Sequence, residues 1–336
     1  MQAAIVERPG LDHLVLTELP EPTPGRGEVL VRLRAASLNY RDTLTVVGGY
    51  GSKQKQSRLI PLCDGAGEVA ALGPGVTRWR IGDRVIGCLF PNWLKGEIDA
   101  EKISLSLGGS VDGCAQEYRV FAETALVQTP ALLSDLEAAT LPCAALTAWS
   151  AVATQGGTGP GHTVLTQGAG GVSLFALQLA RARGATVIAT SSSPARLERL
   201  KALGASHVIN YREEREWGRT ARALTAGRGV DHVVEVGGAG TLAQSIRAVR
   251  VGGTISLIGV LGGAKPDFNL GLVVTQNIRL QGVTVGSRAE FEAMLETIAA
   301  QELRPVIDRV FPLRELRAAI EYLATGRHFG KICIAL

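Results

Sequence analysis

The sequence predicts an α/β protein in which a parallel, doubly wound sheet is joined to a second, barrel-like β domain. The main observation is a change of rhythm near residue 124, where short alternating strands give way to alternating strands and helices. A glycine-rich turn between a buried strand and a helix also supports the prediction of a doubly wound sheet. We expect one domain at 1–123, a central domain at 124–302, and a return to the first domain at 303–336.

Short strands separated by glycine and proline predict the β domain. They are expected at about 2–6, 13–19, 27–37, 65–73 and 82–87, and again near the C-terminus at about 304–313 and 331–336, around one helix. The segment at about 90–112 is polar and irregular, and we expect a long loop there.

Strands of apolar, β-branched residues that alternate with helices predict the parallel sheet, covered on both faces. These strands are expected at about 163–167, 186–190, 207–211, 230–236, 254–259 and 278–283. The helices are expected at about 133–152, 172–183, 194–204, 217–225, 241–250 and 288–300.

Composition and charge exclude several classes of protein. The net charge is +4, and the 35 basic and 31 acidic residues are spread without a basic block, so we expect no nucleic acid partner. No apolar window is long enough to cross a bilayer, and the first residues do not have the pattern of a signal peptide. The five scattered cysteines favour a reducing cytoplasm over a disulfide framework.

The glycine-rich turn has the pattern of a dinucleotide fingerprint. Gly168, Ala169, Gly170, Gly171 and Val172 lie between a strand and a helix, where Gly168 permits a tight turn and Gly170 lets backbone amides approach a diphosphate. The third small position is a serine, a mild departure from the pattern. A dinucleotide cofactor is therefore expected, although such a turn can also serve only to pack a helix on a strand.

The end of the second strand of the central domain favours NADP(H) over NAD(H). An NAD enzyme places Asp or Glu there, to accept a hydrogen bond from the ribose 2′-hydroxyl. This chain has Ser191 and Ser192, followed by Arg196. Hydroxyls with a nearby guanidinium suit a 2′-phosphate, which a carboxylate would repel.

Several motifs resemble the medium-chain dehydrogenase/reductase superfamily. They are GAGEVAALGPGVTRWRIGDRVIG, LPCAALTAW, GAGGVSLFALQLARARGATVIATSSS, ERLKALGASHVINYREE and the closing HFGKICIAL. The resemblance covers essentially the whole chain and is nearest to quinone oxidoreductases, zeta-crystallin-like proteins and enoyl reductases. It implies a GroES-like catalytic domain around a central Rossmann domain, and homodimers or homotetramers.

The resemblance also implies residues that contact the cofactor. In quinone oxidoreductases a basic residue that matches Arg196 and a tyrosine that matches Tyr211 contact the 2′-phosphate. We expect Gly237, Gly259 and Lys331 at the cofactor as well.

Zinc-dependent members of the family bind the metal through positions that match Asn39, the pair Cys63-Asp64, and Cys143. Asn39 is a poor zinc ligand, none of these positions holds a histidine, and the lobe with four closely spaced cysteines is absent. We therefore expect no metal. The alternative is an unusual site made of Cys63, Asp64 and Cys143; otherwise the two cysteines are small buried hydrophobes.

Four residues are expected to be catalytic. The resemblance places Thr147 near the nicotinamide and Asn39 in the N-x-x-D motif of metal-free members, where it would bind the acceptor's carbonyl or the ribose. Tyr50 matches a proton donor of enoyl reductases, although it can equally line the slot with its ring. Tyr40 is a second candidate donor, or stacks on the substrate.

These expectations describe an NADPH-dependent, metal-free reductase of quinones or α,β-unsaturated carbonyl compounds. One rival is an alcohol dehydrogenase with zinc in the unusual site. The other, from a different class, is an NADPH-binding regulatory or RNA-binding protein with little turnover.

Overall fold

The computed structural model describes residues 1–51, 54–55 and 58–336. Its contacts divide the chain into unit 1, Met1–Leu146 with Gly286–Leu336, and unit 2, Thr147–Val285. Segments 124–146 and 286–302, which the strand–helix rhythm assigns to the central domain, group with unit 1. The rhythm identifies a helix, but it does not show on which body the apolar face of that helix packs.

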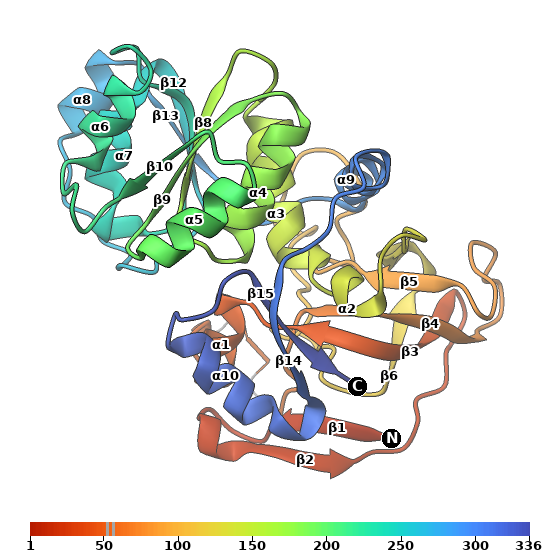
Figure 1. Ribbon diagram of the computed structural model, residues 1–336. Helices are drawn as coiled ribbons and strands as arrows, with labels where there is room; N and C mark the ends of the chain where they lie inside the picture. Colours follow the sequence, from red (N-terminus) through yellow and green to blue (C-terminus); the bar gives the residue numbers. More distant parts are fainter. Residues whose placement is uncertain (52–53, 56–57) are drawn as a thin grey trace. The chain divides into compact units, whose positions relative to one another are not determined.

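Unit 1 contains a two-stranded hairpin and, within its described residues, a seven-stranded sheet (Figure 1). The hairpin pairs β1 (Gln2–Val6) with β2 (Leu14–Glu18). The sheet has the order β14-β15-β3-β4-β5-β7, with β6 paired to β3. Its strands are β3 (Glu28–Ser37), β4 (Asp64–Leu72), β5 (Arg84–Gly87), β6 (Tyr118–Ala122), β7 (Leu126–Gln128), β14 (Ile307–Pro312) and β15 (Lys331–Ala335).

The C-terminal strand completes this sheet, because β15 runs antiparallel to β3 with Cys333 opposite Ser37. This pairing brings the start of β15 next to the end of β3, where a cluster of polar side chains is buried. The helices of unit 1 are α1 (Tyr40–Val46), α2 (Asp135–Ala138), α9 (Arg288–Ala300) and α10 (Leu316–Ala324), with short turns at η1 (Leu11–His13), η3 (Glu123–Ala125) and η7 (Leu313–Glu315).

Unit 2, all of whose residues are described, is a six-stranded parallel sheet in the order β10-β9-β8-β11-β12-β13. The strands are β8 (Thr163–Gln167), β9 (Thr186–Ser191), β10 (His207–Asn210), β11 (Val230–Glu235), β12 (Val249–Leu257) and β13 (Arg279–Gly282). The strand order reverses between β8 and β11, and in such sheets ligands bind at the carboxyl ends beside that reversal. The predicted doubly wound sheet is confirmed.

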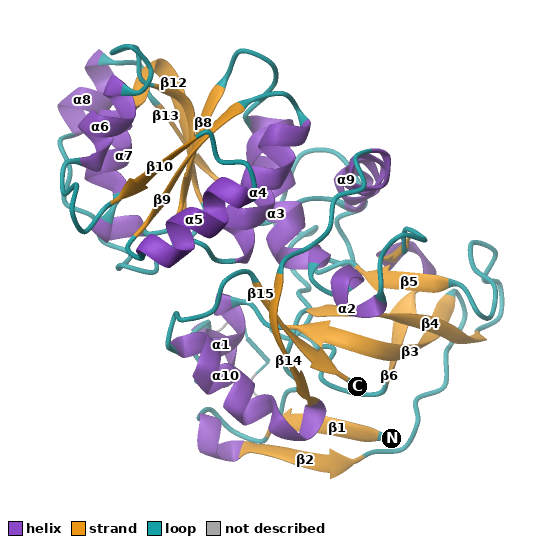
Figure 2. Ribbon diagram, viewed as in Figure 1, coloured by secondary structure: helices purple, strands orange, loops and turns teal. Residues whose placement is uncertain are grey.

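Helices cover both faces of the sheet of unit 2, with α4 and α5 on one face and α6 and α7 on the other (Figure 2). The helices are α4 (Gly171–Ala182), α5 (Pro194–Ala202), α6 (Trp217–Ala223), η6 (Gly238–Gly240), α7 (Leu242–Ala248) and α8 (Leu270–Thr275). Leu165, Ile188, Val233 and Ile255 are fully buried between these layers. Burial on both faces accounts for the continuous apolar runs in the strands.

The structure differs from the sequence expectation in several elements. The single helix expected at 133–152 is a series: α2, the π-helical η4 (Leu141–Ala145), α3 (Leu146–Trp149) and the π-helical η5 (Ser150–Gln155). Apolar spacing does not reveal a π-bulge, which changes the hydrogen-bond partner and not the composition. Residues 90–112, where a long loop is expected, contain neither helix nor strand. In the described residues, no helix is long and apolar enough to cross a membrane.

Candidate active site

The glycine-rich turn at the end of β8 forms an open cradle. Gly168 has φ +73°, a conformation that favours glycine, and its N–H donates to the Thr190 carbonyl at 2.8 Å. A Cβ placed on Gly168 or on Gly170 would meet no heavy atom within 4 Å, so the space beside the turn is free. Gly170 is the N-cap of α4, and Gly171 and Val172 begin that helix. The cradle therefore fits a diphosphate, with helix N–H groups as donors.

Serine at the third small position of the fingerprint has a structural reason. The Ser173 side chain is buried and its hydroxyl donates to the Gln167 carbonyl at 2.6 Å. The hydroxyl is thus satisfied inside unit 2, and the backbone turn keeps the shape that the cradle needs.

The predicted 2′-phosphate residues gather at the carboxyl ends of β9 and β10. The Tyr211 N–H donates to the Ser191 carbonyl at 3.1 Å, and the Ser193 N–H donates to the Ser191 hydroxyl at 3.4 Å. Ser192 is half-buried, as is Arg196 in the first turn of α5. Residues 190–196 include no carboxylate, so this segment would not repel the negative charge of a 2′-phosphate.

A buried carboxylate at the end of β11 organises the loop that follows. Glu235 accepts hydrogen bonds from the backbone N–H groups of Gly237 at 2.8 Å and Gly238 at 3.0 Å, and from the Thr241 hydroxyl. Its other oxygen accepts from Gln167 Nε2 at 2.7 Å and from the hydroxyl of Ser245. Because Gln167 ends β8, this network joins the two strands between which the sheet order reverses.

Gly237 and Gly259 have packing reasons to be glycine. A Cβ on Gly237 would lie 2.3 Å from the Thr241 hydroxyl, and a Cβ on Gly259 would lie 2.4 Å from the Val236 carbonyl oxygen. Both residues belong to the backbone that Glu235 arranges, and their contact with a cofactor stays a prediction. Thr147 is buried in unit 2, where its hydroxyl donates to the Thr284 carbonyl at 3.4 Å; its catalytic role also stays a prediction.

Unit 1 buries a second polar group, which we call the Asp64 cluster: Ser37, Asn39, Cys63, Asp64 and Lys331. Asp64 Oδ2 accepts hydrogen bonds from Ser37 Oγ at 2.8 Å and from Asn39 Nδ2 at 2.7 Å. Lys331 Nζ lies 3.3 Å from the same oxygen and donates to Asn39 Oδ1 at 2.6 Å. The cluster therefore consists of an ion pair bridged by one amide.

The structure turns Asn39 and Lys331 into this cluster. The two Asn39 N–H groups face Asp64 at 2.7 Å and the Cys63 sulfur at 3.4 Å, so neither is left over for an acceptor's oxygen. The side chain of Lys331 is only 3 % exposed. The roles expected for Asn39 at the acceptor and Lys331 at the cofactor stay predictions, and each would need one of these bonds to open.

Burial raises the pKa of the Cys63 thiol well above its usual range, and its hydrogen bond with Cys143 and the nearby Asp64 charge act in the same direction. Cys63 is therefore a neutral thiol at neutral pH. Burial likewise raises the pKa of Asp42 to about 6, against the opposing Arg41 charge. Asp42 accepts the Asn39 backbone N–H at 2.8 Å, so it braces the start of α1.

Two tyrosines lie at the ends of the segment that contains α1. Tyr50 is 39 % exposed, and the Arg41 guanidinium lies 5.8 Å from the centre of its ring. Burial raises the pKa of the Tyr50 phenol, although the Arg41 charge opposes the shift. The hydroxyl is thus a protonated acid with a cation beside it. Tyr40 begins α1 and is largely exposed; its catalytic role stays a prediction.

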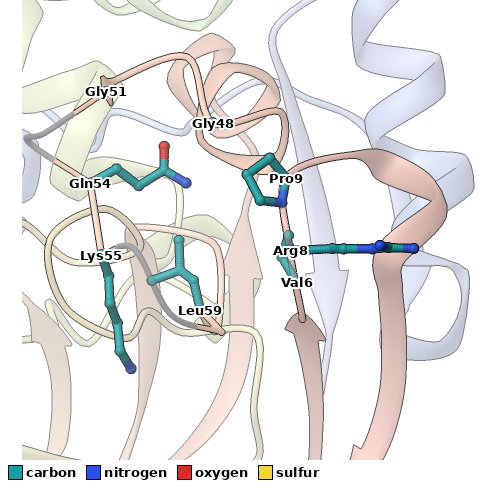
Figure 3. Close-up of a pocket in the computed structure, with 8 residues that line it drawn as sticks. All are labelled: Val6, Arg8, Pro9, Gly48, Gly51, Gln54, Lys55 and Leu59. Atoms are coloured by element: carbon teal, nitrogen blue, oxygen red, sulfur yellow. The ribbon is translucent and has the colours of Figure 1, made fainter.

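A small cavity of about 70 Å³ lies near this segment (Figure 3). Its lining residues are Val6, Arg8, Pro9, Gly48, Gly51, Gln54, Lys55 and Leu59. This volume is far below that of a typical small-molecule site, and none of the described residues that line the cavity belongs to the Asp64 cluster. We assign no function to this cavity.

Comparison with known proteins identifies the family. The model of the alcohol dehydrogenase GroES-like domain matches residues 25–131, and that of the zinc-binding dehydrogenase matches residues 171–300. A zinc-type alcohol dehydrogenase-like protein of Schizosaccharomyces pombe is 42 % identical over 97 % of this chain and 96 % of its own length. The chain belongs to the medium-chain dehydrogenase/reductase superfamily.

Two further proteins illustrate the range of names among those similar to this chain. A Sinorhizobium meliloti protein assigned by name to the alcohol dehydrogenases has a solved structure with a TM-score of 0.93 and 41 % identity, covering 100 % of this chain and 98 % of that one. Acryloyl-coenzyme A reductase of Metallosphaera sedula is 28 % identical over 94 % of this chain and 95 % of its own length. The present protein is thus an oxidoreductase of this superfamily, and the family implies a nicotinamide cofactor.

The name of the matching dehydrogenase family implies zinc, but the residues present do not fit it. In the part of the chain that the structure describes, no group of three or more His, Cys, Asp or Glu side chains could hold a metal ion. At the positions that match zinc ligands, Asn39 is an amide that donates to Asp64, and Asp64 is paired with Lys331.

Sequence reasoning missed two residues of these sites, Glu235 and Arg41, and the direction of a third, Lys331. Glu235 lies at the end of a predicted strand, but a single acidic residue there gives no signal of its network. Arg41 lies inside the N-x-x-D motif, whose pattern specifies only Asn39 and Asp42. The inward direction of Lys331 depends on the pairing of β15 with β3, which joins segments about 300 residues apart.

Proposed function

We propose that the protein is an NADPH-dependent reductase that transfers hydride to α,β-unsaturated carbonyl compounds or quinones without a metal ion. The observation that carries this proposal is the half-exposed Tyr50 phenol beside the Arg41 guanidinium. This pair can deliver a proton to a reduced acceptor without a metal-bound group.

The cradle in unit 2 supports the cofactor part of the proposal. The nicotinamide ring, when bound, supplies the hydride. The turn from Gly168 to Gly171 binds the diphosphate through backbone N–H groups, and Arg196 with the hydroxyl of Ser191 binds the 2′-phosphate. Glu235 accepts hydrogen bonds from the backbone N–H groups of Gly237 and Gly238, so contacts within unit 2 hold the loop after β11.

The acid–base part follows from Tyr50 and Arg41. Reduction of a conjugated C=C bond adds hydride to the β-carbon and leaves an enolate, which takes a proton at the α-carbon. Tyr50 donates that proton from its hydroxyl, and the Arg41 charge stabilises the phenolate that remains until solvent reprotonates it. The raised pKa keeps Tyr50 protonated at neutral pH. For a quinone, the same proton goes to a carbonyl oxygen.

A comparison supports the acceptor class. The name of the Metallosphaera relative contains an α,β-unsaturated acyl thioester, which is activated for hydride addition in the same way as an enone. This similarity extends along nearly the whole chain.

The proposal is tested by initial rates of NADPH and NADH consumption with a simple enone and a small quinone, before and after chelation. We expect faster consumption of NADPH and no effect of the chelator. Tyr50→Phe should lower kcat with the enone by about 10²-fold or more, as expected for loss of a general acid. The matched control is Tyr118→Phe, since Tyr118 in unit 1 also lies beside an arginine, 6.0 Å from Arg32.

Other outcomes would contradict the proposal in different ways. Alcohol oxidation that requires zinc, without enone or quinone reduction, would favour an alcohol dehydrogenase. Tight NADPH binding without turnover of any acceptor would favour a regulatory binding protein.

A further inference from the structure

We propose that the ammonium group of Lys331 is the resident cation of the Asp64 cluster, and that its presence keeps metal ions out of this site. The inference deepens the metal-free part of the proposed function by naming the residue that enforces it. Lys331 acts here as a positioning residue, through Asn39 and Asp64.

The bonding of Lys331 is complete without any external partner. Its Nζ donates to the Leu38 carbonyl at 2.7 Å and to Asn39 Oδ1 at 2.6 Å, and it lies 3.3 Å from Asp64 Oδ2. An ammonium group has three N–H donors, so the three acceptors use all of them. The side chains of Lys331 and Asp64 are 3 % and 0 % exposed, so solvent does not compete for these bonds.

The carboxylate of Asp64 also has its partners within the cluster. Its Oδ2 atom accepts hydrogen bonds from the side chains of Ser37, Asn39 and Lys331, and its Oδ1 atom lies 3.4 Å from the Cys63 sulfur. A metal ion bound between Asp64 and Cys63 would have to displace these donors. It would also lie within a few ångströms of the Lys331 charge, in a site where no solvent screens the repulsion.

Lys331 also fixes the direction of the Asn39 amide. Because an ammonium only donates, Asn39 must present Oδ1 to Lys331, which turns its N–H groups toward Asp64 and Cys63. Asn39 is the N-cap of α1, the helix whose second residue is Arg41. The cation therefore anchors the start of the segment that carries the proposed Arg41–Tyr50 pair.

The test compares metal binding with and without the cation. We would use four untagged proteins: wild type, Asn39→Cys, Lys331→Met, and the double variant Asn39→Cys with Lys331→Met. The Asn39→Cys change adds a third sulfur beside Cys63 and Cys143, so it offers a better set of ligands with the ammonium still in place. Each protein is titrated with Co²⁺, whose thiolate charge-transfer absorption reports binding, and zinc is counted by elemental analysis.

We expect wild type and Asn39→Cys to take up well below one equivalent of metal. The double variant should take up one equivalent, with an affinity at least tenfold higher than that of Asn39→Cys. Stoichiometric Co²⁺ or Zn²⁺ bound by wild type or by Asn39→Cys would overturn the inference. So would a folded double variant whose affinity equals that of Asn39→Cys, because Lys331 would then not be what excludes the metal.

Binding of NADPH by unit 2 and far-ultraviolet circular dichroism verify that each variant is folded. If the double variant does not fold, the wild-type and Asn39→Cys titrations can still overturn the inference, because stoichiometric metal uptake by either protein contradicts it. Metal uptake is measured without substrate, so this inference and the proposed reductase activity can fail separately.

Discussion

The two units each bury a carboxylate completely, and they satisfy it in different ways. Asp64 in unit 1 is paired with the ammonium of Lys331. Glu235 in unit 2 accepts only from neutral groups, namely two backbone N–H groups, two hydroxyls and the Gln167 amide. In the described residues no lysine, arginine or histidine forms a salt bridge with Glu235.

The difference reflects what each carboxylate does for its unit. Neutral donors along the backbone let Glu235 fix the course of the loop at Gly237 and Gly238 without bringing a positive charge next to the cradle. In unit 1 the counter-charge is itself the functional feature, because it occupies a site that would otherwise attract a cation. A buried carboxylate can thus hold the backbone of a loop or bind a cation in a fixed place. The groups that it bonds to show which of these two roles it has.

Breaking the ion pair of unit 1 should have the largest effect on stability. Lys331→Met leaves the Asp64 charge buried without compensation and should lower the free energy of unfolding by about 3–5 kcal/mol. The double variant Lys331→Met with Asp64→Asn should recover much of this loss, because no bare charge remains. Urea unfolding of both single variants and the double variant measures the coupling. Additive losses would contradict the ion pair.

The control for that cycle is an exposed pair in unit 2. Lys201 lies 2.9 Å from Glu198, and both side chains are more than half exposed. Lys201→Met should change the free energy of unfolding by no more than about 0.5 kcal/mol.

A buried histidine extends the comparison to a group that stays neutral in the folded state. Burial, assisted by the Arg279 charge, lowers the pKa of His232 to about 4, and its Nε2 atom lies 2.8 Å from the Ser256 hydroxyl. Between the unfolded value of about 6.5 and about 4, the unfolded chain binds a proton that the folded chain does not. Stability should therefore fall as the pH decreases through this window, by up to about 3 kcal/mol.

The measurement is the free energy of unfolding as a function of pH, for wild type and His232→Gln. We expect the slope between pH 6.5 and pH 4 to be shallower in the variant. An unchanged slope would mean that the pKa of His232 is not lowered in the folded state.

Glu235→Gln tests the neutral arrangement of unit 2. One of its two oxygens becomes an NH₂ group, which faces donors such as Gln167 Nε2, so at least one buried bond is lost. We expect a loss of about 1–3 kcal/mol in stability and weaker NADPH binding by calorimetry. The exposed Glu198→Gln change should alter neither. Unchanged NADPH affinity in Glu235→Gln would separate this network from the cradle.

The smallest expected effect concerns the choice of cofactor. Arg196→Ala should raise the KM for NADPH about tenfold, which corresponds to about 1.4 kcal/mol, and should leave the KM for NADH nearly unchanged. Equal changes for both cofactors would indicate that Arg196 does not contact the 2′-phosphate.

The sequence predicted the framework of unit 2 well, because local patterns determine it. Apolar runs marked its strands, and the turn at Gly168 marked the cradle. The Asp64 cluster was less predictable, because it joins Asn39, Asp64 and Lys331 from three distant segments. Sequence motifs named these positions individually, but only the pairing of β15 with β3 shows that a lysine supplies the charge.

Hydride transfer without a metal is tested most directly by isotope tracing on metal-depleted protein. The enzyme is given NADPH deuterated at C4 on the transferred face, with a simple enone, and the product is analysed by mass spectrometry while zinc is counted in the same sample. We predict one deuterium at the β-carbon and full activity at far less than one equivalent of zinc. Product that appears only in proportion to added zinc, or product without deuterium, would contradict the account.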